Sequence, residues 1–332
     1  MVVDISTKFA GLDLKSPIIV GSSGLTGSTK HFKEFEQNGA GAIVLKSLFE
    51  EEIVFEYNKV LEEAEKYGYD QENIDYFDLK IKQDNLNKYI QLIKDAKDQV
   101  SIPVIASINC VSTYEWIYFT KKIEEAGADA LELNIFLLPS DAKKSSQEIE
   151  ETYFEIIKKV KSEVKIPLII KMSSYFTNLG QMIQKVSKSG INGLVLFNRF
   201  YSPDIDINSK HITASSVFST PTDITIPLRW VAMSSGKVDC SLAASTGVHD
   251  GEGLIKMVLA GVDAVEIVST LYKNGASQIK VMNDMLINYL KDQDLESISQ
   301  IKGLVSQRSV TNPALFERVQ FMKYFSDRED II

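Results

Sequence analysis

The stretch AGADALELN at residues 126–134 decides the fold, because three other segments of the chain repeat its design. NGAGAIVLK at 38–46, SGINGLVLFN at 189–198 and AGVDAVEIVS at 260–269 each place a glycine before a short apolar run. The glycine suits the left-handed position that ends a helix, and a strand buried on both faces requires an apolar run. Each run ends in a polar residue. The repeated unit is therefore a helix, a turn and a buried strand with a polar carboxyl end.

Four further apolar runs lie between these repeats, and three of them begin with proline. A proline at the first residue of a strand costs no ladder hydrogen bond. Amphipathic helical patterns fill most of the intervals, at 29–38, 82–99, 113–126, 146–163, 178–189, 251–260 and 275–291. Together the two sets of apolar runs predict eight strands, at 17–21, 42–46, 103–107, 129–134, 166–171, 193–198, 241–245 and 263–268.

Strands that alternate with helices predict an α/β fold with a parallel sheet. An open, doubly wound sheet is the alternative, but residues 21–27 lack the G-x-G-x-x-G spacing that such a sheet carries after its first strand. We therefore predict a single domain over residues 1–332, with a (β/α)8 TIM barrel over about 9–292. We expect loop insertions after the second and sixth strands, at 48–80 and 199–228, and a C-terminal helical extension at 293–332.

Composition narrows the class of partner. The net charge of −9 argues against nucleic acid and anionic membranes, and no apolar run approaches the ~18 residues of a membrane span. The first residues lack the basic start of a signal peptide, and two cysteines form no disulfide framework, so we expect a cytoplasmic protein. His31, His211 and His249 are isolated in the sequence, which predicts no metal site. We expect a small-molecule substrate, and a homodimer is left open.

The residues that close the strands are the candidate site, because the carboxyl ends of barrel strands form the active-site face. Lys46 and Lys171 each end an apolar run. A lysine there either extends past the rim or offers a fixed cation to an anion, or to a ring that becomes negative on reduction. Asn134 and Asn198 end two other strands, and Asn109 follows a third. Their amides either tie off loop backbone or recognise a flat heterocycle, since an amide is both donor and acceptor.

The seventh and eighth strands are followed by hydroxyl-bearing residues. The loops after these two strands commonly hold a phosphate in TIM barrels, with help from backbone N–H groups at a helix start. The sequence therefore predicts an anion site at Thr246, Gly247, Ser269 and Thr270.

In these features the chain resembles the FMN-binding barrels of the dihydroorotate dehydrogenase and dihydropyrimidine dehydrogenase group, from about Phe9 to Gly275. The resemblance rests on six segments in barrel order. They are SSG at 22–24, VLKS at 44–47, IASINC at 105–110, ADALELN at 128–134, IIK at 169–171 and ASTGV at 244–248.

The resemblance implies an FMN-dependent oxidoreductase that moves a hydride between flavin N5 and a C–C bond of a small pyrimidine-like or acidic substrate. It implies that Lys46 and Lys171 are catalytic, and that Lys171 stabilises the negative charge of the reduced ring. The implied cofactor residues are Ser22, Ser23, Lys46, Ser47, Asn109, Asn134, Lys171, Asn198, Thr246, Gly247, Ser269 and Thr270. The implied substrate residues are Asn73, Asn134, Asn198 and Arg199, of which Arg199 would bring a cation for an acidic group.

The loop after the fourth strand departs from the family. The family pattern is Asn-Leu-Ser-Cys-Pro, or has serine as the general base, whereas residues 134–140 read NIFLLPS. General-base catalysis contributes ~10²–10⁴ in rate, so we expect poor dihydroorotate oxidation unless Ser140 or another group substitutes. Two alternatives stay open. The chain is either a flavin-binding protein without dehydrogenase turnover or a flavin-free Schiff-base aldolase that uses Lys171.

Overall fold

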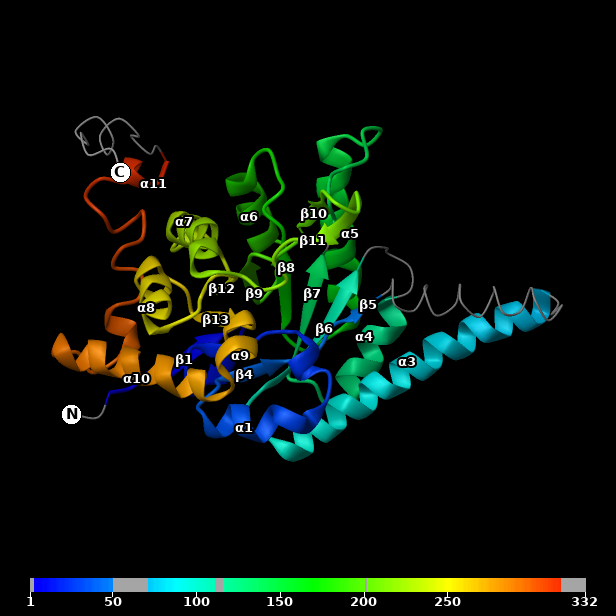
Figure 1. The fold of residues 1–332 in the computed structure, drawn as a ribbon, viewed down its shortest axis with the longest axis horizontal. Coiled ribbons are helices and arrows are strands. Elements are labelled where there is room, and N and C mark those ends of the chain that lie inside the picture. Colours follow the sequence, from blue (N-terminus) through cyan, green and yellow to red (C-terminus); the bar gives the residue numbers. More distant parts are fainter. Residues whose placement is uncertain (1–2, 50–70, 111–115, 136, 201, 318–332) are drawn as a thin grey trace.

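The computed structural model describes residues 3–49, 71–110, 116–135, 137–200 and 202–317 (Figure 1). Its central feature is a closed sheet of parallel strands, since β4 pairs with β3 on one side and with β6 on the other. The predicted TIM barrel and all eight predicted strands are confirmed. The barrel strands are β3 (Ile18–Val20), β4 (Ala42–Val44), β6 (Val104–Cys110), β7 (Ala130–Ile135), β8 (Leu168–Met172), β9 (Gly193–Leu196), β12 (Ser241–Ser245) and β13 (Ala264–Ile267).

The glycines of the repeated unit have the predicted left-handed conformation. Gly39, Gly127, Gly190 and Gly261 all have positive φ, and Gly261 ends its helix with φ of 116°. A residue with a Cβ atom is strained at positive φ, so glycine favours the turn that leads each helix into the next strand. The same local signal therefore sets four of the helix-to-strand connections.

Helices surround the barrel in Figure 1, and most lie where the amphipathic patterns predict them. Two helices were missed. The whole of α7 is TIPLRWVAMS, which has a proline in its first turn and buries that proline and a serine at helical spacing, so its buried face is not marked by apolar residues alone. The short helix α9 lies directly before the predicted helix at 275–291. The helices before β8 are α1 (Phe32–Gln37), α3 (Gln71–Gln99), α4 (Trp116–Glu125) and α5 (Ser146–Glu163). Those after it are α6 (Leu179–Ser187), α7 (Thr225–Ser234), α8 (Gly251–Ala260), α9 (Ser269–Asn274), α10 (Ser277–Asp292) and α11 (Ala314–Glu317). Short 3-10 turns are η1 (Gly24–Thr26), η2 (Thr29–His31), η3 (Pro221–Ile224) and η4 (Ile298–Gln300).

Side chains inside the barrel form a core of their own, separate from the core between strands and helices. The inner core is made of alternate strand residues such as Ile105, Ala130 and Ile169. The hairpin β1 (Thr7–Phe9) and β2 (Leu12–Leu14) adds Phe9 and Leu14 to this inner core. The amino-terminal end of the barrel is therefore filled with apolar side chains, and the opposite end is left for polar ones.

The predicted insertions and extension are described in part. After β9 the chain forms an exposed antiparallel hairpin of β10 (Pro203–Asp206) and β11 (His211–Ala214), whereas residues 50–70 of the earlier insertion lie outside the described residues. A short strand β5 (Leu48–Phe49) pairs with β6 before that segment. The extension is helical only at η4 and α11 up to residue 317. Between these two elements the backbone N–H groups of Gly303, Val305 and Gln307 donate to carbonyls near the ends of α8 and α7. No helix in the described ranges is long and apolar enough to cross a bilayer.

We expect Phe9→Ala to lower the free energy of unfolding by about 3–5 kcal/mol, because it leaves a cavity in the inner core. Phe9 is fully buried, and its ring lies against Gly193 at the start of β9. Lys8→Ala is the matched control, since the Lys8 side chain is 75% exposed in the same strand, and it should change stability by less than about 0.5 kcal/mol. Chemical denaturation measures both. Equal effects of the two variants would contradict the plugged-barrel description.

Candidate active site

A layer of polar side chains lies directly above the apolar inner core. Side chains alternate in a strand, so the residue two positions beyond an inner-core residue also faces the barrel axis. Ala130 and Ile169 belong to the inner core, which places Glu132 and Lys171 above them. The same rule adds Ser107, Ser245 and Glu266 to this layer, and all five are buried.

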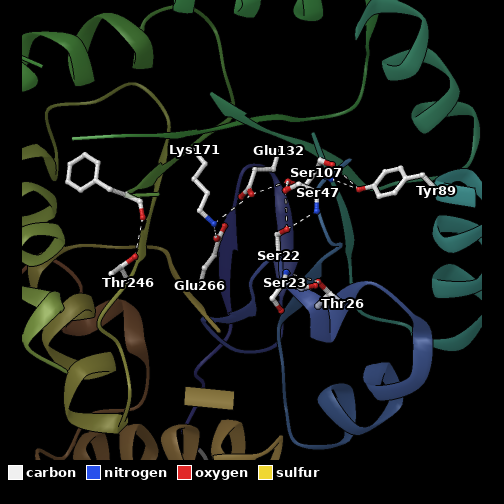
Figure 2. Close-up of polar contacts among 11 residues, drawn as sticks. Ser22, Ser23, Thr26, Ser47, Tyr89, Ser107, Glu132, Lys171, Thr246 and Glu266 are labelled. Atoms are coloured by element: carbon white, nitrogen blue, oxygen red, sulfur yellow. Dashed lines mark hydrogen bonds and ion pairs between the residues drawn. The ribbon is translucent and has the colours of Figure 1, made fainter. Parts of the chain in front are cut away.

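Lys171 is held by two carboxyl groups within this layer (Figure 2). Its Nζ lies 2.5 Å from Oε2 of Glu266 and 3.8 Å from Oε1 of Glu132. Burial by itself favours the neutral amine, but the two carboxyl groups outweigh it and raise the pKa of Lys171 above its usual value. The lysine is therefore an ammonium at neutral pH, paired inside the protein.

Glu132 is almost fully buried, with 1% of its surface exposed. Burial, and then the charge of nearby Glu266, raise the pKa of Glu132 well above its usual range, while Lys171 lowers it by less. With both carboxyls ionised, Oε2 of Glu132 would have no hydrogen-bond donor among the described residues. A proton on Glu132 removes both the like-charge repulsion and this unmet acceptor.

A chain of hydroxyl groups leads from Glu132 to the ends of three neighbouring strands (Figure 2). Ser107 Oγ donates to Glu132 Oε1 over 3.4 Å, and lies 2.8 Å from Ser47 Oγ. Ser47 Oγ in turn lies 3.0 Å from Ser22 Oγ. Tyr89 on α3 fixes Ser107, because its hydroxyl accepts from Ser107 N at 2.7 Å and donates to Ser107 O at 3.0 Å. The floor of the site is thus one connected polar network.

Two asparagine carbonyls beside this network have no partner. Oδ1 of Asn109 and Oδ1 of Asn134 are buried, with no hydrogen-bond donor among the described residues. Strand register places Asn109 beside Asn134, and Asn134 beside Lys171. A buried acceptor without a donor costs about 1–3 kcal/mol, so such atoms point to a missing ligand group. The matching group is an N–H.

A cavity of about 410 Å³ opens above the floor, which is within the size range of small-molecule sites. It brings together residues from the ends of β3, β8, β9, β12 and β13, as the barrel prediction requires. The predicted site residues that line it are Ser22, Lys171, Asn198, Arg199, Thr246, Gly247 and Ser269. Glu266 and Ser245 line it as well.

The predicted anion site is partly used by the protein itself. Thr246 and Gly247 have φ of 79° and 82°, and a Cβ on Gly247 would lie 2.1 Å from the backbone nitrogen of Ile224. A left-handed β-branched residue is rare and tends to occur at ligand sites. Ser269 Oγ accepts from the backbone nitrogen of Ser219 at 2.9 Å. Thr270 is fully buried and donates to the carbonyl of His249, so its hydroxyl is engaged within the fold.

Other predicted residues lie at the edge of the site. Ser23 caps η1, where its Oγ accepts from the backbone nitrogen of Leu25, and Lys46 is half-buried after β4. Ser140 is exposed in the loop after β7. The guanidinium of Arg199 donates to the carbonyls of Val217 and Ser216, at 2.6 and 2.8 Å, so it braces a loop at the cavity wall. The side chain of Asn73 lies outside the described residues.

Sequence reasoning missed the two glutamates, although both lie in quoted repeats. Glu132 and Glu266 are single acids inside otherwise apolar strands, at ALELN and AVEIV. A charge is almost never fully buried unless it is paired, so an acid at an inward position of a barrel strand is itself a signal. What the strand pattern does not show is the partner of each acid.

Comparison with known proteins gives a consistent result. The family model described as dihydroorotate dehydrogenase matches residues 4–290. Two curated relatives bear the name dihydroorotate dehydrogenase B (NAD(+)), catalytic subunit. The one from Thermoplasma volcanium is 26% identical over 92% of this chain and 99% of its own length, and the one from Methanocaldococcus jannaschii is 26% identical over 91% and 98%. The crystal structure of DHODH from Eimeria tenella in complex with ferulenol has a TM-score of 0.64 at 16% identity, covering 91% of this chain and 88% of that one, and shows the shared fold.

We expect Glu132→Gln to remove a pH-dependent contribution to stability. A folded-state pKa above the usual 4.5 means that the folded chain retains a proton that the unfolded chain releases. The wild-type protein therefore loses stability relative to Glu132→Gln as pH rises from about 4.5 towards neutral, by about 1.4 kcal/mol per pH unit. Denaturation of both proteins across this range measures the difference. A difference that does not vary with pH would show that Glu132 is ionised in the folded protein.

Proposed function

The chain belongs to the dihydroorotate dehydrogenase family, and from this premise we propose that it is an FMN-dependent oxidoreductase. Its reaction would transfer a hydride between flavin N5 and a C–C bond of a small pyrimidine-like or acidic substrate. The observation that carries the proposal is the polar floor of the barrel mouth. There the carbonyls of Asn109 and Asn134 have no donor among the described residues, and strand register places Asn134 beside Lys171. The proposal includes a cytoplasmic location, from the composition alone.

The residues at the barrel mouth fit a flavin. An isoalloxazine ring has an N–H between two carbonyls, and within the described ranges no donor of that kind reaches the Asn109 and Asn134 carbonyls. Thr246, Gly247 and Ser269 line the far wall of the cavity, after the two strands whose loops hold phosphate in many barrels. FMN, when bound there, supplies the hydride-accepting centre.

The chain's own residues would bind and orient the ligands. The asparagine amides fix the ring edge, and the Ser22–Ser47–Ser107 hydroxyl chain supports the strand ends around it. The apolar inner core closes the barrel beneath the floor, so water reaches the site from one side. Asn198 follows β9 and lines the cavity, and we propose that it holds a flat substrate together with Asn134.

The proposed substrate differs from dihydroorotate because the loop after β7 lacks the family's general base. Leu137 and Leu138 occupy the loop after β7, and Leu138 is 54% exposed. Ser140 is the first hydroxyl-bearing residue after Leu138 in the sequence, and its side chain is exposed as well. The proposed substrate is therefore a molecule whose proton is removed by another group or is already acidic.

The geometry of Lys171 argues against the aldolase alternative. A Schiff base needs a neutral amine, but Lys171 is ion-paired and its pKa is raised. We expect borohydride to trap no carbonyl compound on the protein. The other alternative, a flavin-binding protein without turnover, keeps the same cofactor site and differs only in substrate-dependent reduction.

The purified protein should be yellow and release FMN on denaturation. Asn134→Ala should weaken FMN binding about fivefold, because one hydrogen bond of about 1 kcal/mol is lost. Asn208→Ala is the control, since Asn208 is exposed in the loop between β10 and β11. Flavin fluorescence during titration of the apoprotein measures both affinities. A colourless protein that takes up no FMN would overturn the proposed function.

Dihydroorotate should bleach the bound flavin far more slowly than the ~10 s⁻¹ that is typical of enzymes. The reason is the absence of a thiol or hydroxyl at the base position of the family loop. Anaerobic stopped-flow absorbance measures the rate, with dithionite as the positive control. Fast bleaching would mean that another base acts, and loss of that rate in Ser140→Ala would identify it.

A further inference from the structure

Lys171 does not face the site as a free cation. The resemblance assigns it to a ring that becomes negative on reduction, yet its ammonium is already 2.5 Å from a carboxylate of the chain itself. That carboxylate, on Glu266, comes from β13 and lines the same cavity as Lys171. The charge that a ligand meets is therefore set by the whole cluster and not by the lysine.

We propose that Glu266 and Glu132 set the charge of the cofactor site: Glu266 neutralises the Lys171 ammonium, and Glu132 carries a proton, so the floor has no net charge. The proposal rests on the proposed function for the identity of the ligand. It makes Glu266 and Glu132 positioning residues that act on the flavin through Lys171.

The assignment of the negative charge to Glu266 follows from distance. Lys171 Nζ is 2.5 Å from Glu266 but 3.8 Å from Glu132, and all three residues are at most 7% exposed. At such burial a charge without a close partner is far more costly than in water. The one ammonium can neutralise one carboxylate, and the closer carboxylate is the one it stabilises.

The assignment of the proton to Glu132 follows from its surroundings. The groups that face it are Ser107 from β6, Lys171 from β8, Glu266 from β13 and the Tyr89 phenol from α3. Burial holds the pKa of Tyr89 above its usual value, so the phenol adds no charge. Lys171 is the one cation in this set and is committed to Glu266. An ionised Glu132 would have no cation left to neutralise it, and the raised pKa of Glu132 agrees with a neutral acid.

The consequence is a measurable property of the bound flavin. Reduction adds electrons to the ring, so a net positive charge beside it raises the midpoint potential and a net negative charge lowers it. A neutral floor does neither. Removing the Glu266 charge would leave the lysine unopposed, whereas Glu132→Gln would only replace one neutral group by another of the same shape.

The test uses the full-length protein loaded with FMN, reduced with dithionite in the presence of a reference dye at pH 7. We expect a more positive midpoint potential in Glu266→Gln and an unchanged one in Glu132→Gln. Lys171→Met should make the potential more negative, and the double variant Lys171→Met/Glu266→Gln should return it towards the wild-type value. Glu252→Gln is the control, because it removes an exposed carboxylate paired with Lys256.

An unchanged potential in Glu266→Gln, or a positive shift in Glu132→Gln, would overturn the charge assignment. If a single variant does not fold, the double variant, which leaves no unpaired charge, still gives a result: a potential far from wild type would count against the neutral floor. Infrared spectra of the apoprotein test the proton separately, since the protonated-carboxyl band should disappear in Glu132→Gln. Failure of the wild type to take up FMN would instead overturn the proposed function, while the infrared result would still decide the state of Glu132.

Discussion

Closure of the parallel sheet is the constraint on which the rest of the structure depends. A closed barrel directs every second side chain of each strand towards one axis, where space is limited. Ile105, Ala130 and Ile169 fill that space as an apolar layer, and Phe9 seals it from the amino-terminal end. At the next inward positions Ser107, Glu132 and Lys171 form a polar floor, and the cavity opens above it. The residues that stabilise the barrel and the residues that form the site therefore lie in adjacent layers of the same strands.

Within that floor, electrostatics is the dominant organising force. Three ionisable groups share a volume with little water, and their arrangement is tolerable only because one ammonium, one carboxylate and one proton balance each other. The hydroxyl chain through Ser107 and Ser47 ties this cluster to neighbouring strands. A family resemblance based on single residues does not describe such a site, because the lysine's role depends on the acids around it.

Prediction from the sequence succeeded where a feature is local. The left-handed glycines, such as Gly127 and Gly261, and the buried strands after them follow from a few neighbouring residues. The missed helix α7 buries Pro227 and Ser234 at helical spacing from Val231, so its buried face is not marked by apolar residues alone. The guanidinium of Arg199 bonds to the backbone of a loop 17 and 18 residues away, and strand patterns cannot show such a contact.

The sequence by itself determined the barrel, its strand order and the polar residues that end the strands, because these depend on periodicity and on glycine conformation within short segments. Only the tertiary structure decided which of those residues meet. Lys171 and Glu266 are 95 residues apart and come into contact because β8 and β13 curve around one axis. The pairing, burial and protonation of these side chains depend on residues from several strands, so no single segment of the sequence determines them.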